Sequence, residues 1–177
     1  MEIRAKCKLD FDSTKALTHL SFYKKTNPKK AVRLREIFCF ILLFVIIAEL
    51  IVFGFDSALN NLIYVDLFII ALNLYMYFVI PKSRYRALGK MKDIENNYLF
   101  KDNVLKVSSK SEEYSGEAEI EYSLFTKVYE TSAYFFLFQT NNQTFIIDKS
   151  TIEGGSADDI RNKLTSFVKN KYFICRY

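Results

Sequence analysis

The sequence predicts an α+β membrane protein, in which a two-helix transmembrane hairpin is joined to a small antiparallel β-barrel closed by a C-terminal helix. Three observations support this fold class. Two apolar stretches of nineteen residues, 37–55 and 62–80, are separated by only six residues. Residues 97–148 alternate between apolar and polar side chains, with turn residues between the runs. Residues 156–171 then show apolar side chains at helical spacing.

The N-terminal arm, residues 1–36, is predicted to form one strand and one amphipathic helix on the cytoplasmic side. Between residues 2 and 9 every second side chain is apolar, which is typical of a half-buried strand. Asp12 or Ser13 is a suitable N-cap for a helix that runs to about Lys25. Asn27–Pro28 is expected to end this helix.

The hairpin, residues 37–80, contains two stretches that are each long enough to cross a hydrocarbon core of ~30 Å at ~1.5 Å per residue. Its loop, 56–61, has no Lys or Arg, whereas both flanks are basic. The positive-inside rule therefore predicts a multi-pass protein of the cell membrane with both termini in the cytoplasm. The basic residues expected at the membrane surface are Lys24, Lys25, Lys29, Lys30, Arg33, Arg35, Lys82, Arg84, Arg86, Lys90 and Lys92.

Three polar residues, Glu49, Asp66 and Asn73, interrupt the predicted spans. In an antiparallel hairpin Glu49 and Asp66 would lie at similar depths, near the outer surface. One interpretation is an ion or proton site, or a contact with a partner helix. The other is two carboxylates that reach outer headgroups or bond to a neighbouring helix. We favour the second interpretation, because two helices alone cannot enclose a pathway.

Beyond Pro81, residues 81–177 are predicted to form one cytoplasmic domain that begins with a basic helix at 83–96. Gly154–Gly155 ends the strands of this domain, and Ser156 caps its last helix. Together with the N-terminal strand, seven antiparallel strands and a closing helix are the pattern of a pleckstrin-homology-like barrel. The six strands expected after the hairpin are 97–100, 104–108, 114–122, 127–131, 133–140 and 143–148.

The runs YLFKDNVL at 98–105 and IEYSLFTKVYET at 120–131, and the hairpin at 134–149, carry a family resemblance. Together with the order of elements, they make the chain similar to YcxB-like proteins. Tyr122 stands where members of that family often have Trp, and Asp148 where they often have Pro. The resemblance implies a bacterial membrane protein with a pleckstrin-homology-like cytoplasmic domain, and it implies no catalytic motif.

No group of residues in the sequence indicates catalysis or the binding of a cofactor or metal. Gly154–Gly155 lacks the Lys-Ser/Thr of a phosphate-binding loop, and a lone His19 cannot complete a catalytic triad. The three cysteines lack metal-ligand spacing, so we expect them to pack as small apolar residues. A row of acids at 112–121 is compatible with a cation site, although a solvated strand face is the favoured interpretation. We therefore expect a protein that is not an enzyme.

The net charge of +5 gathers beside the predicted spans, which disfavours a nucleic-acid partner. We expect a membrane-anchored, non-catalytic adaptor or regulatory protein that binds a protein or peptide at the inner leaflet of the lipid bilayer. Self-immunity to an antimicrobial peptide is one concrete version, which rests on fold analogy alone. The alternative is a lipid-sensing module that binds anionic headgroups through the basic residues. A transporter is disfavoured, because only two spans are predicted.

Overall fold

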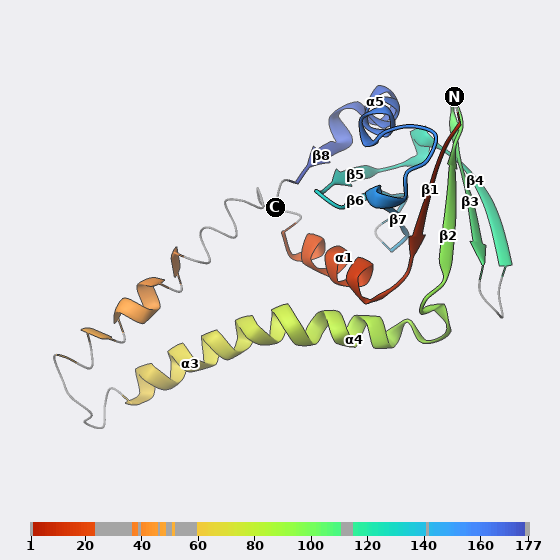
Figure 1. Ribbon diagram of the computed structural model, residues 1–177. Helices are drawn as coiled ribbons and strands as arrows, with labels where there is room; N and C mark the ends of the chain where they lie inside the picture. Colours follow the sequence, from red (N-terminus) through yellow and green to blue (C-terminus); the bar gives the residue numbers. More distant parts are fainter. Residues whose placement is uncertain are drawn as a thin grey trace.

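The computed structural model describes residues 2–23, 37, 38, 40–45, 47, 48, 51, 60–110, 115–140 and 142–175, of which 22, 23, 60–63, 65 and 66 are described by their backbone alone. Its centre is a pair of four-stranded sheets that enclose one hydrophobic core (Figure 1). One helix covers each end of this pair, and a long helical segment extends away from it (Figure 1).

The first sheet is antiparallel, with the strand order β1-β2-β3-β4. In β1 the side chains of Ile3, Ala5 and Cys7 are buried, and those between them are exposed, as the alternation predicts. Ile3 lies opposite Phe100 of β2, so the strand of the N-terminal arm completes a sheet of the C-terminal part, and this prediction is confirmed. The strands are β1 (Ile3–Lys8), β2 (Glu95–Phe100), β3 (Val104–Lys110) and β4 (Ser115–Glu121).

The second sheet has the order β7-β6-β5-β8, and its last pair, β5 with β8, is parallel. The strands are β5 (Lys127–Glu130), β6 (Tyr134–Phe138), β7 (Thr144–Asp148) and β8 (Tyr172–Ile174). Short 3-10 turns lie at the ends of these strands: η3 (Tyr122–Leu124) precedes β5, η4 (Lys149–Thr151) follows β7, and η5 (Lys169–Lys171) precedes β8. Strand β6 is buried along nearly its whole length, so side chains on both of its faces are covered.

Two helices close the core, and both have side-chain caps. Helix α1 (Phe11–Tyr23) begins with the Ser13 N–H donating to Asp10 Oδ1 at 2.9 Å, so the cap is Asp10 and neither of the expected residues, Asp12 and Ser13. Helix α5 (Ala157–Val168) begins with a capping box between Ser156 and Asp159, which confirms the predicted cap. The largest fully buried side chains of the core are Tyr122, Phe100, Phe125, Phe135, Phe136, Leu20, Leu105, Leu137, Ile147, Ile160, Leu164 and Val128.

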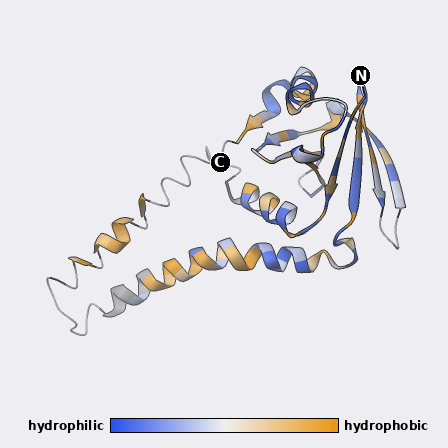
Figure 2. Ribbon diagram, viewed as in Figure 1, coloured by the Kyte–Doolittle hydropathy of each residue, from blue (hydrophilic) through white to orange (hydrophobic). Residues whose placement is uncertain are grey.

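The long helical segment consists of α3 (Asn60–Leu74), the π-helical turn η1 (Tyr75–Val79), α4 (Ile80–Ala87) and the 3-10 turn η2 (Gly89–Met91). Many of its described side chains between positions 64 and 79 are exposed and apolar (Figure 2). The basic helix expected at 83–96 corresponds to α4, which begins earlier, at Ile80, and ends earlier, at Ala87. Gly89 has a φ of 55°, and the chain forms a strand from Glu95.

Two predictions about the membrane are contradicted. In the parts of the chain that are described, no helix combines the length and the apolar character needed to cross a membrane. Helix α3 has 15 residues, which is ~22 Å at ~1.5 Å per residue, and a π-helical turn follows it. The predicted transmembrane hairpin and the localisation based on it are therefore corrected. Of the first predicted span, 37–55, only short stretches are described.

The predicted pleckstrin-homology-like barrel is also wrong. The described strands form two separate four-stranded sheets, and an unpredicted strand, β8, pairs with β5. Alternation of side chains identifies which residues face the core, and it does so equally well for a barrel and for two packed sheets. The strand pairing therefore could not be read from that pattern.

Candidate functional site

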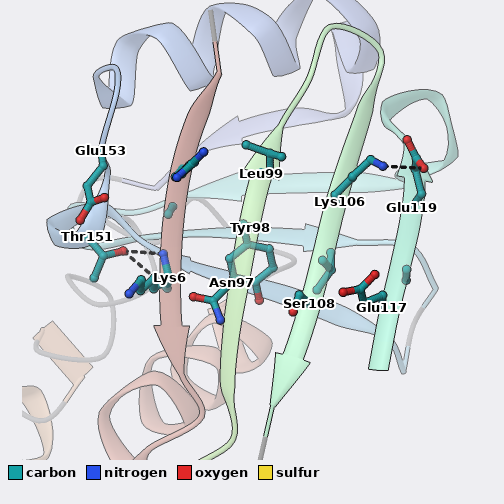
Figure 3. A pocket seen from close by; sticks show the side chains of 14 residues that line it. Lys6, Asn97, Tyr98, Leu99, Lys106, Ser108, Glu117, Glu119, Thr151 and Glu153 are labelled. Carbon is teal, nitrogen blue, oxygen red and sulfur yellow. Dashed lines mark hydrogen bonds and ion pairs between the residues drawn. The ribbon is translucent and has the colours of Figure 1, made fainter. Parts of the chain in front are cut away.

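A trough of about 660 Å³ opens on the outer face of the first sheet, and we call it the outer trough (Figure 3). Its floor is made by every second side chain of the four strands, which the pleat turns away from the core. These side chains are Arg4 and Lys6 of β1, Asn97 and Leu99 of β2, Lys106 and Ser108 of β3, and Glu117 and Glu119 of β4. The site thus depends on all four strands of the sheet.

The register of the sheet arranges these side chains in two rows that cross the strands. One row consists of Lys6, Asn97, Ser108 and Glu117, and the other of Arg4, Leu99, Lys106 and Glu119. Both rows begin with a basic residue on β1 and end with an acidic residue on β4. The two rows therefore place two basic side chains at one end of the outer trough and two acidic side chains at the other, and Glu153 of the following segment adds a carboxylate at the β1 end.

The segment after β7 forms a rim along the edge of β1. The hydroxyl of Thr151 accepts a hydrogen bond from the Lys6 N–H at 2.8 Å, and Arg4 and Glu153 exchange backbone hydrogen bonds of 2.8 and 2.9 Å. Gly154 permits this approach, because it has a φ of 74° and a Cβ there would lie 2.7 Å from the Glu2 carbonyl oxygen. Gly154–Gly155 is thus a loop that holds the rim on β1.

Most of the charges in the outer trough are weakly paired. Lys106 Nζ lies 3.3 Å from Glu119, whereas Arg4 and Lys6 lie 3.8 and 3.9 Å from acids outside the trough. Within the described residues Glu117 has no ion pair. Exposed pairs of this kind contribute ~0–1 kcal/mol each, so a ligand could replace them at little cost.

The described side chains of this site offer amide, hydroxyl, ammonium, guanidinium and carboxylate groups for hydrogen bonds and ion pairs. Within the described residues, no three side chains of His, Cys, Asp or Glu are grouped so that they could hold a metal ion. The nearest thiol, Cys7, faces away from the outer trough, toward a smaller groove of about 230 Å³. Burial, together with the charges of Asp148 and Asp10, raises the pKa of the Cys7 thiol to about 12, so it stays protonated at neutral pH.

A second group of charged side chains is buried beside the second sheet, around Glu130. The side chain of Glu130 is only 3 % exposed and accepts hydrogen bonds from Lys149 Nζ at 2.6 Å, from Arg161 Nε at 2.7 Å and from the Tyr172 hydroxyl at 2.5 Å. Lys149 also donates to the Thr131 carbonyl. This cluster ties β5 to η4, α5 and β8, and its polar atoms point at one another, so it serves as a structural clamp.

The Glu130 cluster makes the stability of the fold depend on pH in the acid range. Burial alone would raise the pKa of Glu130, but the hydrogen bonds from Arg161, Lys149 and Tyr172 and the charge of Lys149 lower it from 4.5 to about 2. Because the folded pKa lies below the unfolded value, the carboxylate stabilises the fold above pH 4.5, and this contribution is lost as the pH falls toward 2. We expect the urea midpoint of the wild type to fall in this range, and to fall less steeply in a Glu130→Gln variant. Equal slopes for the two proteins would contradict this assignment.

The sequence-predicted basic residues fall into two groups. Lys24, Lys25, Lys29, Lys30, Arg33 and Arg35 lie outside the described residues. Lys82, Arg84, Arg86, Lys90 and Lys92 lie on α4, on η2 and directly after it. Arg84 donates to the Ser21 hydroxyl at 3.1 Å, and Lys92 lies over the Tyr85 ring at 5.5 Å. These contacts hold α4 to α1 and to its own turn, and they are remote from the outer trough.

The polar residues of the predicted spans are not brought together as a site. Glu49 lies outside the described residues, as does the side chain of Asp66. Asn73 donates to the Ile69 carbonyl at 2.9 Å, within its own helix. His19 packs on Tyr77 with ring centroids 4.7 Å apart, so it joins α1 to η1. Cys175 is buried, as expected for a small apolar residue, and Cys39 lies outside the described residues.

Sequence reasoning missed both the outer trough and the Glu130 cluster. The alternation in residues 2–9 and 114–122 identifies their outward side chains, but only the pairing through β2 and β3 places them in one trough. For Glu130 the available signal is one acid that directly follows the buried Val128 and Tyr129 in its strand. Its partner Arg161 lies 31 positions later, and no local pattern connects the two.

A comparison with protein families matches residues 110–164 to the model described as YcxB-like protein. This confirms the family resemblance for that part of the chain, which includes β4, most of the second sheet and the rim of the outer trough. Strands β1 and β2 and the helices before them lie outside the match. No curated protein and no solved structure matches the chain.

Proposed function

We propose that this chain, with its YcxB-like segment at 110–164, is a non-catalytic binding protein that takes up a peptide or protein segment in the outer trough. The observation that carries the proposal is the convergence of eight outward side chains from four strands on one concave surface. Its volume, about 660 Å³, lies within the ~300–1,000 Å³ that is typical of ligand sites. Self-immunity to an antimicrobial peptide is one use that such a site would serve.

A bulky substitution in the floor of the outer trough tests this function. Ser108 is central and its side chain faces outward, so Ser108→Trp is expected to fill the trough without disturbing the core. Ligands should first be selected from a random peptide library on the purified full-length chain. The variant is then expected to bind them at least about tenfold more weakly, because their contact surface is lost.

The matched control is Asn162→Trp, which places the same ring on the exposed face of α5. This variant should bind the selected peptides as the wild type does. If Ser108→Trp leaves binding unchanged, the outer trough is not the binding site. Binding to vesicles of anionic lipid that is lost in a Lys82→Gln/Arg86→Gln variant and kept in Ser108→Trp would instead support the lipid-headgroup alternative.

A further inference from the structure

The geometry points to the chemistry of the ligand: an extended peptide segment that carries one acidic and one basic side chain four residues apart. This inference rests on the proposed function and adds to it the identity of the recognised groups. It follows from the positions of the charges along the two rows of the outer trough.

The charges that are available to a ligand lie at opposite ends of the outer trough. The β1 end carries Arg4 and Lys6, with the carboxylate of Glu153 on the rim beside them (Figure 3). The β4 end carries Glu117, which is available, and Glu119, which is paired with Lys106. The central charge, Lys106, is compensated by Glu119 at 3.3 Å. A ligand with a single charge would therefore use only one end, whereas a segment with both signs would use the whole trough.

The length of the rows sets the spacing of the ligand's charges. Strands β1 and β4 are separated by three strand spacings of ~4.8 Å, which is ~14 Å. An extended peptide that lies across the strands covers this distance in about four residues at ~3.4 Å each. Side chains separated by an even number of positions in an extended segment project to the same side, so residues i and i+4 both face the sheet.

The middle of the outer trough can bind the ligand side chain that lies halfway between the two charged ones. Leu99 is half-buried there and offers an apolar surface to the side chain at i+2. Asn97 and Ser108 lie beside it in the other row. Within the described part of the chain their side chains make no hydrogen bond, so an amide and a hydroxyl are available to the peptide backbone of the ligand.

The test uses labelled seven-residue peptides and the purified full-length chain, with fluorescence anisotropy as the readout. One peptide carries aspartate at its second, valine at its fourth and lysine at its sixth position. A second peptide has the same composition with the two charges adjacent. The first should bind about fivefold more tightly, because the second can place only one of its charges at an end of the trough and so loses one exposed ion pair of ~1 kcal/mol. Equal affinities would overturn the inference.

A second experiment reverses charges in the outer trough and measures which peptide the variant prefers. In Glu117→Lys/Glu119→Lys both ends of the outer trough are basic, so this variant should prefer a peptide with aspartate at both charged positions. The control, Asp102→Lys/Glu121→Lys, makes the same change of net charge outside the outer trough and should keep the wild-type preference. If Ser108→Trp abolishes binding of the library ligands but charge spacing and charge reversal have no effect, this inference fails and the proposed function stands. If Ser108→Trp has no effect on those ligands, both fail.

Discussion

Replacing Ile3 with aspartate is expected to lower the free energy of unfolding of the two-sheet domain by about 4 kcal/mol. Ile3 is 3 % exposed and lies opposite Phe100, and a Cβ at position 155 would come within 2.8 Å of its Cγ1. The site has no room for water around a carboxylate. The protein must therefore protonate the new side chain in an apolar environment or separate β1 from the rim.

This change can be followed by urea unfolding with near-ultraviolet circular dichroism, because buried tyrosines of the second half of the chain, such as Tyr98 and Tyr122, report on the core. The control is Arg4→Asp, which makes an exposed change at the next residue and removes only a weak pair with Glu2 at 3.8 Å. It should cost less than about 1 kcal/mol. Similar effects of the two substitutions would show that β1 does not share the core.

Replacing Glu130 with glutamine is expected to cost about 3 kcal/mol, the lower end of what the loss of one partner from a buried ion pair costs. The lower end applies because Arg161 is 34 % exposed and can turn its charge toward water, whereas Lys149 is 15 % exposed and is more confined. The same urea titration measures the effect. Glu117→Gln, an exposed change of the same kind, should alter stability by no more than about 0.5 kcal/mol.

A double-mutant cycle identifies the cause of this loss. When Lys149→Met is added to Glu130→Gln, the unpaired ammonium is removed and part of the stability should return. The coupling energy between the two positions should then be about 1 kcal/mol or more. Strictly additive losses would mean that Glu130 does not stabilise the fold through its pair with Lys149.

Local patterns predicted the parts of this fold that depend on local physics. The alternation in residues 2–9 follows from the pleat, and Ser156 with Asp159 satisfies the first N–H groups of a helix, so strand β1 and the start of α5 were predicted correctly. The end of α5 was not. Lys169 adopts a φ of 43°, which ends the helix and frees Tyr172–Ile174 to become β8. Its parallel pairing with β5 joins segments far apart in the sequence, and no local pattern indicates it.

The predictions that failed inferred a three-dimensional arrangement from the length or number of segments alone. Apolar length predicted two spans, but α3 ends after 15 residues in a π-helical turn. The count of strands predicted one barrel, but the chain divides them between two sheets. The outer trough belongs to the same class: its residues are visible in the sequence as outward positions, and only the register makes Lys6 and Glu117 ends of one row.

The pairing of β1 with β2 also determines the order in which the molecule can be made. During synthesis the ribosome completes β1 roughly ninety residues before β2, which is on the order of 10 s at ~5–20 residues per second. For that time the apolar side chains of Ile3, Ala5 and Cys7 have no sheet to join. Closing so large a loop is slow, because its entropy is lost before the pairing contributes anything. The first of the described strands to leave the ribosome is therefore among the last to be stabilised.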